Sequence, residues 1–199
     1  MAAAVARSVA VSLLLVPCAT ASARDASKGA GNGVRDAHPV ISLFRSGSAW
    51  GWSPEYRLTL FADGGVRYQG SLFVKIRGAC SAKLAKQAVG RLLEAARDAS
   101  FFTWAASRPH CDIVDAGATT LSLYDLKKRK VVTAEVCKRD PSLEFFWKLA
   151  QAVDDAVQVE RWIGTAAERA PLVADSENER DRAFREKFDW NKPAATCPP

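Results

Sequence analysis

The clearest pattern of apolar and polar positions lies in residues 41–78, where side chains alternate as they do in half-buried strands. The alternation is cleanest from Tyr56 to Leu60. An Asp63-Gly64-Gly65 turn follows, with residues that tolerate a positive φ. The strand pattern then resumes at Val66, Tyr68, Phe73, Val74 and Ile76. These residues predict an antiparallel meander.

Two later segments have helical spacing. Ser81 can cap a helix that runs to about Asp98, because apolar residues recur there three and four apart. Asp140-Pro141 predicts the start of a second helix, since a cap residue precedes a proline at the first helical position. The apolar stripe of this helix contains Leu143, Phe146, Trp147, Ala150, Val153 and Val157. Residues 101–104, which include three aromatic side chains, are expected to close the edge of the core.

A hairpin is predicted between the two helices. Thr119–Leu126 and Lys130–Val136 flank a charged turn at Lys127-Lys128-Arg129. Together these elements predict an α+β fold, with an antiparallel sheet of about five strands (the meander plus the hairpin) and two helices packed on one face.

The chain of 199 residues suits one domain with extensions at both ends. We expect a signal peptide at residues 1–23, a flexible N-terminus at 24–39, the α+β domain at 40–164 and a charged C-terminal extension at 165–199. The extension is expected to contain a short helix at Asp175 to Asp189, with Phe184 and Phe188 as a small docking face.

The predicted signal peptide has one early charge, Arg7, an apolar run from Val9 to Val16, and small residues for cleavage near Ala21. The run is about half of the ~20 apolar residues that a membrane-spanning helix needs. We therefore expect a periplasmic or secreted protein with no transmembrane segment after processing. A lipoprotein signal that uses Cys18 is less favoured, because Pro17 stands where such signals carry a small residue.

The formal net charge is +6, but the basic residues are scattered instead of forming a stripe. This distribution disfavours a nucleic-acid partner and fits a charge that serves solubility. The expected partner is an unidentified envelope or extracellular ligand. The sequence gives no indication of the oligomeric state.

Four of the five cysteines remain after processing: Cys80, Cys111, Cys137 and Cys197. An even number in an exported chain usually means two disulfides, with three possible connectivities. We expect Cys111 to pair with Cys137, because the predicted hairpin places Cys137 opposite Ala118 at the mouth of the loop that carries Cys111. Cys80 then pairs with Cys197 by elimination.

The chain resembles a bacterial exported family known as domain of unknown function 6438, over about residues 41–164. The matching residues are Ile41-Ser-Leu-Phe-Arg45, Gly51, Pro54, Tyr56, Asp63-Gly64, Val66, Tyr68, Gly70, Gly78, Phe101-Phe102 and Trp162-Ile163-Gly164. Family members usually read Cys-x-Gly-x-Cys-Pro-x-Tyr before the tyrosine, whereas this chain has Ala49 and Ser53 at the two cysteine places. The resemblance supports the fold and implies no activity.

The main candidate binding site is a turn that contains Trp50, Trp52 and Tyr56. Three aromatic rings in an exposed turn can form a stacking surface for sugars, peptides or an aromatic ligand. The competing interpretation is that one or two of them fold over the sheet in place of the missing cysteines.

The candidates for catalysis are weaker. His110, Cys111, Asp112 and Asp115 lie in one loop, but the disulfide explains Cys111 better than a metal does, and no metal or cofactor is predicted. Asp154 and Asp155 are adjacent on a helix, so we expect them to point apart and to be solvated. A recognised nucleophile motif is absent. The sequence therefore favours a non-enzymatic binding or interaction module of the cell envelope, with a small envelope enzyme or metal-dependent hydrolase that uses the His110 loop as the alternative.

Overall fold

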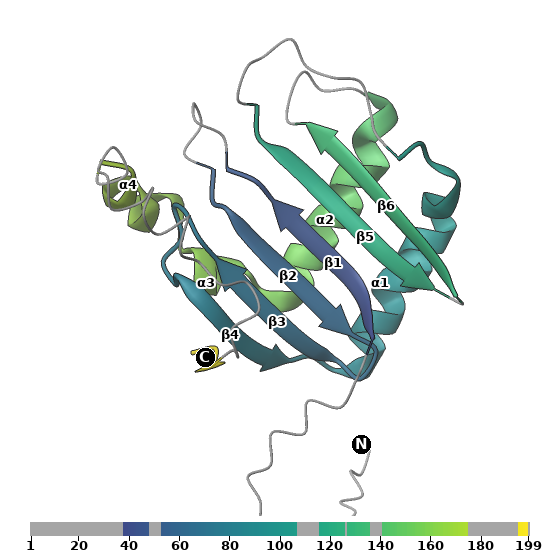
Figure 1. The fold of residues 1–199 in the computed structure, drawn as a ribbon, viewed down its shortest axis with the longest axis horizontal. Helices are drawn as coiled ribbons and strands as arrows, with labels where there is room; N and C mark the ends of the chain where they lie inside the picture. Colours follow the sequence, from purple (N-terminus) through teal and green to yellow (C-terminus); the bar gives the residue numbers. More distant parts are fainter. Residues whose placement is uncertain are drawn as a thin grey trace, which may run out of the picture. The chain divides into compact units, whose positions relative to one another are not determined.

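The computed structural model describes residues 38–47, 53–106, 116–125, 127–135, 141–174 and 195–198, and their elements are drawn in Figure 1. The strands are β1 (Pro39–Arg45), β2 (Tyr56–Phe61), β3 (Gly65–Gly70), β4 (Gly78–Lys83), β5 (Ala118–Asp125), β6 (Lys128–Glu135) and β7 (Ala195–Thr196). The helical segments are α1 (Lys86–Asp98), η1 (Phe101–Thr103), η2 (Pro141–Leu143), α2 (Glu144–Val157), α3 (Glu160–Ile163) and α4 (Ala166–Ala174). The predicted α+β class is confirmed.

The strands form one sheet in the order β6-β5-β1-β2-β3-β4-β7. Every neighbouring pair is antiparallel except β4 and β7, which are parallel. The described part of the chain thus has seven strands, more than the predicted five or so, because β4 and the short β7 have no strong strand pattern in the sequence.

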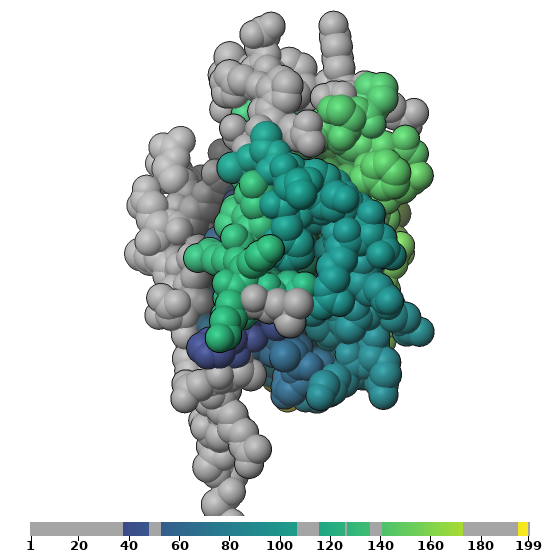
Figure 2. All heavy atoms as spheres, turned by 90° about the vertical axis from the view of Figure 1, so that its right-hand side faces the viewer, coloured from purple at the N-terminus to yellow at the C-terminus, as the bar shows by residue number. Residues whose placement is uncertain are grey.

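One face of the sheet carries the core. Alternate residues such as Leu43, Leu58 and Leu121 are fully buried, and they share one apolar cluster with Val89 of α1 and Phe146 of α2. Figure 1 shows α1 and α2 behind the sheet. In the space-filling view of Figure 2, the teal surface of α1 lies beside the green surface of the β5–β6 hairpin.

The C-terminal part of the predicted first helix is correct, and the second helix is confirmed with a short 3-10 turn ahead of it. α1 ends at Asp98, and Phe101 then packs into the core as expected. Pro141 opens η2 and α2 follows from Glu144. No helix among the described residues is both long and apolar enough to cross a bilayer.

The predicted start of the first helix is wrong. Ser81 is a residue of β4, where it lies opposite Arg67 of β3. α1 begins at Lys86 after Ala85, which gives no side-chain cap. The small residues of Gly78–Lys83 have weak strand propensity. They form a strand because they pair with β3.

The predicted third strand of the meander, at residues 73–76, is a connection instead. Phe73 has a φ of 51°, which a strand does not accommodate. The backbone N–H groups of Lys75 and Ile76 donate to the carbonyls of Ile163 and Trp162, at 3.0 and 2.9 Å. The connection therefore binds the C-terminal end of α3, whose carbonyls have no partner within the helix.

The hairpin is confirmed, with its turn shifted by one residue. Asp125 lies opposite Lys128, and Lys127 has a φ of 70°. This register places Glu135 opposite Ala118, so the expected position of Cys137 opposite Ala118 is wrong by two residues.

A disulfide joins Cys80 of β4 to Cys197, just beyond β7, with Cα atoms 4.7 Å apart. The N–H of Cys197 also donates to the carbonyl of Ser81 at 2.7 Å. This half of the predicted cysteine pairing is confirmed. The other half, Cys111 with Cys137, lies outside the described residues, as do the predicted signal peptide and the predicted helix at Asp175 to Asp189.

Candidate functional site

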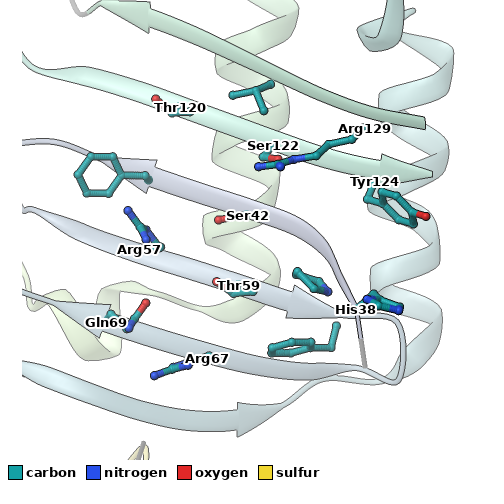
Figure 3. Close-up of a pocket in the computed structure, with 14 residues that line it drawn as sticks. His38, Ser42, Arg57, Thr59, Arg67, Gln69, Thr120, Ser122, Tyr124 and Arg129 are labelled. Carbon is teal, nitrogen blue, oxygen red and sulfur yellow. The ribbon is translucent and has the colours of Figure 1, made fainter. Parts of the chain in front are cut away.

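The sheet face that points away from α1 and α2 carries a hollow of about 750 Å³, which we call the outer-face hollow. Figure 3 shows its side chains, which come from β1, β2, β3, β5 and β6 and, for His38, from the residue before β1. It is lined by His38, Pro39, Ser42, Phe44, Arg57, Thr59, Phe61, Arg67, Gln69, Thr120, Ser122, Tyr124, Arg129 and Val131. Strand alternation explains this set, because residues two apart share a face.

The strand register places three short hydroxyl side chains in a row across the sheet. Ser122 lies opposite Ser42, and Ser42 lies opposite Thr59. We call these three residues the hydroxyl row. On β2, Thr59 lies between Arg57 and Phe61. These two side chains are larger than those of the hydroxyl row, so they rise above it on the sheet face (Figure 3).

The hydroxyl row makes no side-chain hydrogen bond within the part of the chain that the structure describes. Thr120 and Thr133, one row further along the same face, bond to each other with 3.0 Å between their hydroxyl oxygens. Ser42, Thr59 and Ser122 are half-buried. Each hydroxyl can donate one hydrogen bond and accept two.

Three arginines line the outer-face hollow. They are Arg57, Arg67 and Arg129, and no aspartate or glutamate is among its described lining residues. The guanidinium carbon of Arg57 lies 5.1 Å from the centroid of the Phe44 ring, a cation–π contact.

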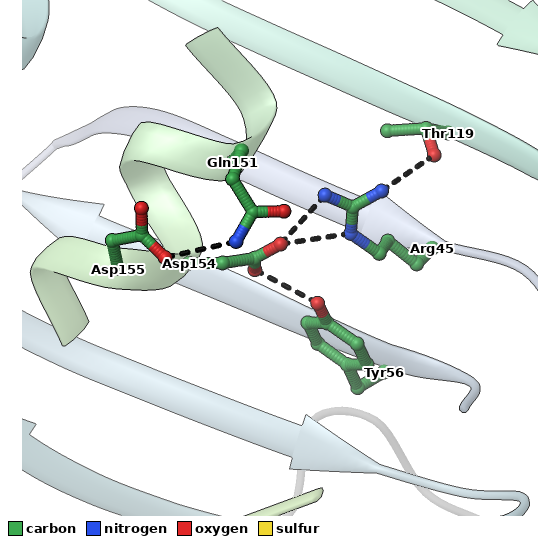
Figure 4. A network of polar contacts seen from close by, with 6 residues as sticks. All are labelled: Arg45, Tyr56, Thr119, Gln151, Asp154 and Asp155. Atoms are coloured by element: carbon green, nitrogen blue, oxygen red, sulfur yellow. Dashed lines mark hydrogen bonds and ion pairs between the residues drawn. The ribbon is translucent and has the colours of Figure 1, made fainter. Parts of the chain in front are cut away.

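A second polar cluster lies on the inner face of the sheet, between β1, β2 and α2 (Figure 4). Arg45 donates from Nε and Nη2 to Oδ2 of Asp154, at 2.9 and 2.6 Å, and from Nη1 to the hydroxyl of Thr119 at 3.2 Å. The hydroxyl of Tyr56 donates to Oδ1 of Asp154 at 2.8 Å. The Asp154 side chain is only 5% exposed.

This cluster stabilises the fold instead of presenting reactive groups. Burial raises the pKa of Asp154, and Arg45 and Tyr56 offset part of that rise. Burial and the Asp154 carboxylate also raise the pKa of Tyr56 above its ordinary value. A depression of about 710 Å³ adjoins the cluster, but both oxygens of Asp154 already accept hydrogen bonds. We therefore assign the cluster to attachment of α2 to the sheet.

Of the three residues predicted for the aromatic turn, the structure describes Tyr56. Trp50, Trp52, His110 and Cys111 lie outside the described residues. Tyr56 is 1% exposed, so its ring packs in the core and offers no stacking face.

The expectation that the adjacent aspartates are both solvated is wrong for one of them. Asp154 is buried, whereas Asp155 is exposed and accepts a hydrogen bond from Gln151 at 2.8 Å. They do point apart, and for Asp154 that direction is into the core.

The sequence did contain a signal for the cluster around Asp154. Arg45 follows Ile41 and Leu43 at the spacing of the buried strand face, and Asp154 lies four residues after Ala150 and three before Val157 in the apolar stripe of α2. A charge of each sign on two apolar faces indicates a buried pair. The hydroxyl row had no comparable signal, because it requires the register between three strands.

Comparison with known proteins identifies the kind of domain. The model of a family described as a domain of unknown function, DUF6438, matches residues 40–156, which is more than half of the chain. No curated protein sequence matches the chain.

Proposed function

The chain belongs to this DUF6438 family, and from that premise we propose that it is an exported, non-enzymatic binding or interaction module of the bacterial cell envelope. The observation that carries the proposal is the outer-face hollow, on the side of the sheet opposite α1 and α2. A concave surface with convergent polar groups and aromatic rings is what ligand sites usually offer.

Export is supported by the apolar run at Val9 to Val16 and by the disulfide between Cys80 and Cys197. Disulfides persist in oxidising compartments and are rare in the cytosol. We therefore place the protein in the periplasm or outside the cell. Edman sequencing of the protein from its native cell is expected to begin at Ser22 or Arg24, and an intact Met1 would contradict export.

Binding is favoured over catalysis by the composition of the outer-face hollow. Hydrolysis by a side-chain nucleophile needs a base beside it, commonly oriented by a carboxylate. The described lining supplies hydroxyls, arginines and the imidazole of His38, but neither a thiol nor a carboxylate that could orient the imidazole. Such a lining can hold and orient a ligand, which is what a binding module requires.

The experiment is retention of soluble envelope components on the immobilised processed protein. Ser42→Tyr fills the hydroxyl row and should abolish retention while the unfolding midpoint in urea stays unchanged. Gln87→Tyr adds the same ring to the exposed side of α1 and should retain components as the wild type does. Equal retention by both variants would contradict the outer-face hollow as the binding surface.

The same assay tests the other predicted residues. If Trp50 and Trp52 form a stacking platform, changing either to alanine should weaken retention with little loss of stability. If they are buried, each change should instead cost about 3–5 kcal/mol of unfolding free energy. Release of new products that disappears in His110→Ala would favour the alternative, an envelope enzyme.

A further inference from the structure

We propose that the first half of β6 is a second interaction surface, at which an extended acidic peptide adds one strand to the sheet. The surface consists of Lys127, Lys128, Arg129 and Lys130 together with the backbone edge beside them, and we call it the basic edge. The proposal does not depend on binding at the hydroxyl row, which lies on β5, β1 and β2.

The backbone of the basic edge is open on one side. β6 is the last strand in the order of the sheet, and Figure 1 shows it at the margin. The N–H of Thr133 points outward there, because it donates to the carbonyl of Ala106 at 3.1 Å. Backbone groups of alternate residues point to the same side in an antiparallel pair, so those of Arg129 and Val131 also point outward. Within the described residues, these two make no backbone hydrogen bond to a segment on that side.

The two edges of the sheet differ. At β4, β7 adds a parallel strand, and the disulfide between Cys80 and Cys197 holds it there. At β6, Ala106 pairs with the backbone at Thr133, in the second half of the strand. An unpaired edge is a template for an incoming strand, and strand addition is a common way to bind an extended peptide. In the described sheet, the basic edge is therefore the position suited to strand addition.

The basic edge also carries positive side chains that are not neutralised. Lys127, Lys128 and Arg129 are exposed, and Lys130 is half-buried. None of the four makes a side-chain hydrogen bond, ion pair or ring contact within the part of the chain that the structure describes. Asp125 lies opposite Lys128, but its two carboxylate oxygens accept hydrogen bonds from α1, at 2.6 and 2.7 Å. This charge complements an acidic partner.

The cations lie on both faces of the strand, and this arrangement favours a particular peptide sequence. Lys128 and Lys130 share one face and Arg129 lies on the other, since residues two apart share a face. An added strand also alternates its side chains between the two faces, so consecutive acidic residues would meet cations on both. Opposite charges directly across from each other stabilise paired strands, so the partner has about three consecutive acidic residues.

The same charges act against a second copy of the chain. Lysine on an edge strand commonly prevents pairing between copies. If two copies of β6 paired antiparallel about Arg129, Lys128 of one would lie opposite Lys130 of the other, and like charges placed opposite each other are destabilising. The basic edge therefore selects an acidic strand and disfavours self-association.

The test is fluorescence anisotropy of a labelled, end-capped peptide, Thr-Val-Glu-Glu-Glu-Val-Thr, titrated with the processed protein. Two control peptides separate charge from strand addition. Replacing the three glutamates by glutamines removes the charge and should weaken binding about tenfold. Methylating the backbone nitrogens of the glutamates keeps the charge but removes their N–H donors, and it should weaken binding at least tenfold.

Variants of the protein locate the surface. Lys128→Gln/Lys130→Gln should weaken binding of the peptide about tenfold. Lys86→Gln/Arg91→Gln removes two exposed cations from α1, which changes the net charge equally, and should bind as the wild type does. Affinity should also fall as salt rises, because salt screens exposed charges.

Equal affinity of the methylated and unmodified peptides would overturn strand addition, and equal affinity of the two double variants would overturn its placement on β6. Phosphatidylglycerol vesicles are the comparison probe. If Lys128→Gln/Lys130→Gln abolished vesicle binding and the peptide did not bind, the basic edge would belong to a membrane contact, and the proposal would be wrong. Ser42→Tyr should leave the affinity for the peptide unchanged, so failure of the basic edge and failure of the hydroxyl row can be distinguished.

Discussion

Asp154 holds three elements together through two carboxylate oxygens. One oxygen accepts from Arg45 of β1 and the other from Tyr56 of β2, while Asp154 itself belongs to α2. Each buried polar atom in this contact has a partner, and that offsets the desolvation of the charges. The arrangement is therefore sensitive to loss of any one member.

Asp154→Asn should lower the free energy of unfolding by about 3 kcal/mol. This is the low end of the range for breaking a buried pair, because the Arg45 side chain is still 21% exposed. Urea unfolding followed by circular dichroism measures the change. Asp155→Asn is the matched control and should stay within about 0.5 kcal/mol of the wild type, since Asp155 is exposed. Equal effects of the two substitutions would show that the buried pair contributes nothing.

At the scale of residues, the sequence predicted well which positions share a face of a strand or helix. It predicted poorly whether individual charged side chains are buried. The buried positions of β2 and the stripe of α2 follow from spacing alone, because each period fixes which residues share a face. Spacing also implied a buried direction for Arg45 and Asp154. The charge of the two side chains suggested that they are exposed to solvent, but the contact between Arg45 and Asp154 determined where they lie.

At the scale of elements, the start of α4 is fixed by a reciprocal cap. The N–H of Glu168 donates to the hydroxyl of Thr165 at 3.2 Å, and the N–H of Thr165 donates to Oε2 of Glu168 at 2.8 Å. This is a capping box. Lys75, from the connection between β3 and β4, also donates to Oε1 of Glu168 at 2.8 Å, so the cap joins α4 to the sheet.

The cap predicts a pH dependence. The hydrogen bond from Lys75 and those from Thr165 lower the pKa of Glu168 from an ordinary value of 4.5 to about 2. Because the pKa is lowered in the folded protein, the stabilisation is fully present above about pH 4.5 and is lost as the pH falls toward 2. The protection factors of the α4 amides, which correct the exchange rate for its intrinsic pH dependence, should fall over that window in the wild type and be low throughout in Glu168→Gln. Glu160→Gln, an exposed change on α3, should behave as the wild type. A flat profile between pH 4.5 and 2 in the wild type would contradict the assignment.

The disulfide between Cys80 and Cys197 closes a loop with a sequence separation of 117. On the chain-entropy model, removing it should lower the unfolding free energy by about 5 kcal/mol. The double variant Cys80→Ala/Cys197→Ala measures this loss. Cys111→Ala/Cys137→Ala is the comparison, and with its shorter predicted loop it should cost about 3 kcal/mol. Non-reducing peptide mapping that recovers Cys80 linked to Cys111 would contradict both pairings.

The elements that sequence analysis missed share a physical cause. β4 consists of small residues, and β7 has only two residues, so neither has a local pattern strong enough to predict a strand. β4 is formed by pairing with β3, and β7 is held to β4 by the disulfide and its parallel bridge. Both depend on contacts between residues far apart in the chain.

At the scale of the whole molecule, the two faces of the sheet differ. One face packs in the core, and the other carries the proposed binding surface. Its inner face packs on α1 and α2, and its outer face carries the hydroxyl row and the arginines. The class of fold could be predicted from the sequence, because the apolar pattern of the main strands and helices is regular. The outer-face hollow could not be predicted, since it results from the register of β5, β1 and β2.

The most direct measurement is an amide chemical-shift map of the isotopically labelled processed protein, titrated with the soluble fraction of the cell envelope. We expect saturable shifts at Ser42, Thr59 and Ser122, with α1 and α2 unaffected. Ser42→Tyr should abolish these shifts, and Gln87→Tyr should preserve them. Shifts confined to α1 and α2, or none at the hydroxyl row at saturation, would contradict the claim that the outer face of the sheet is the binding surface.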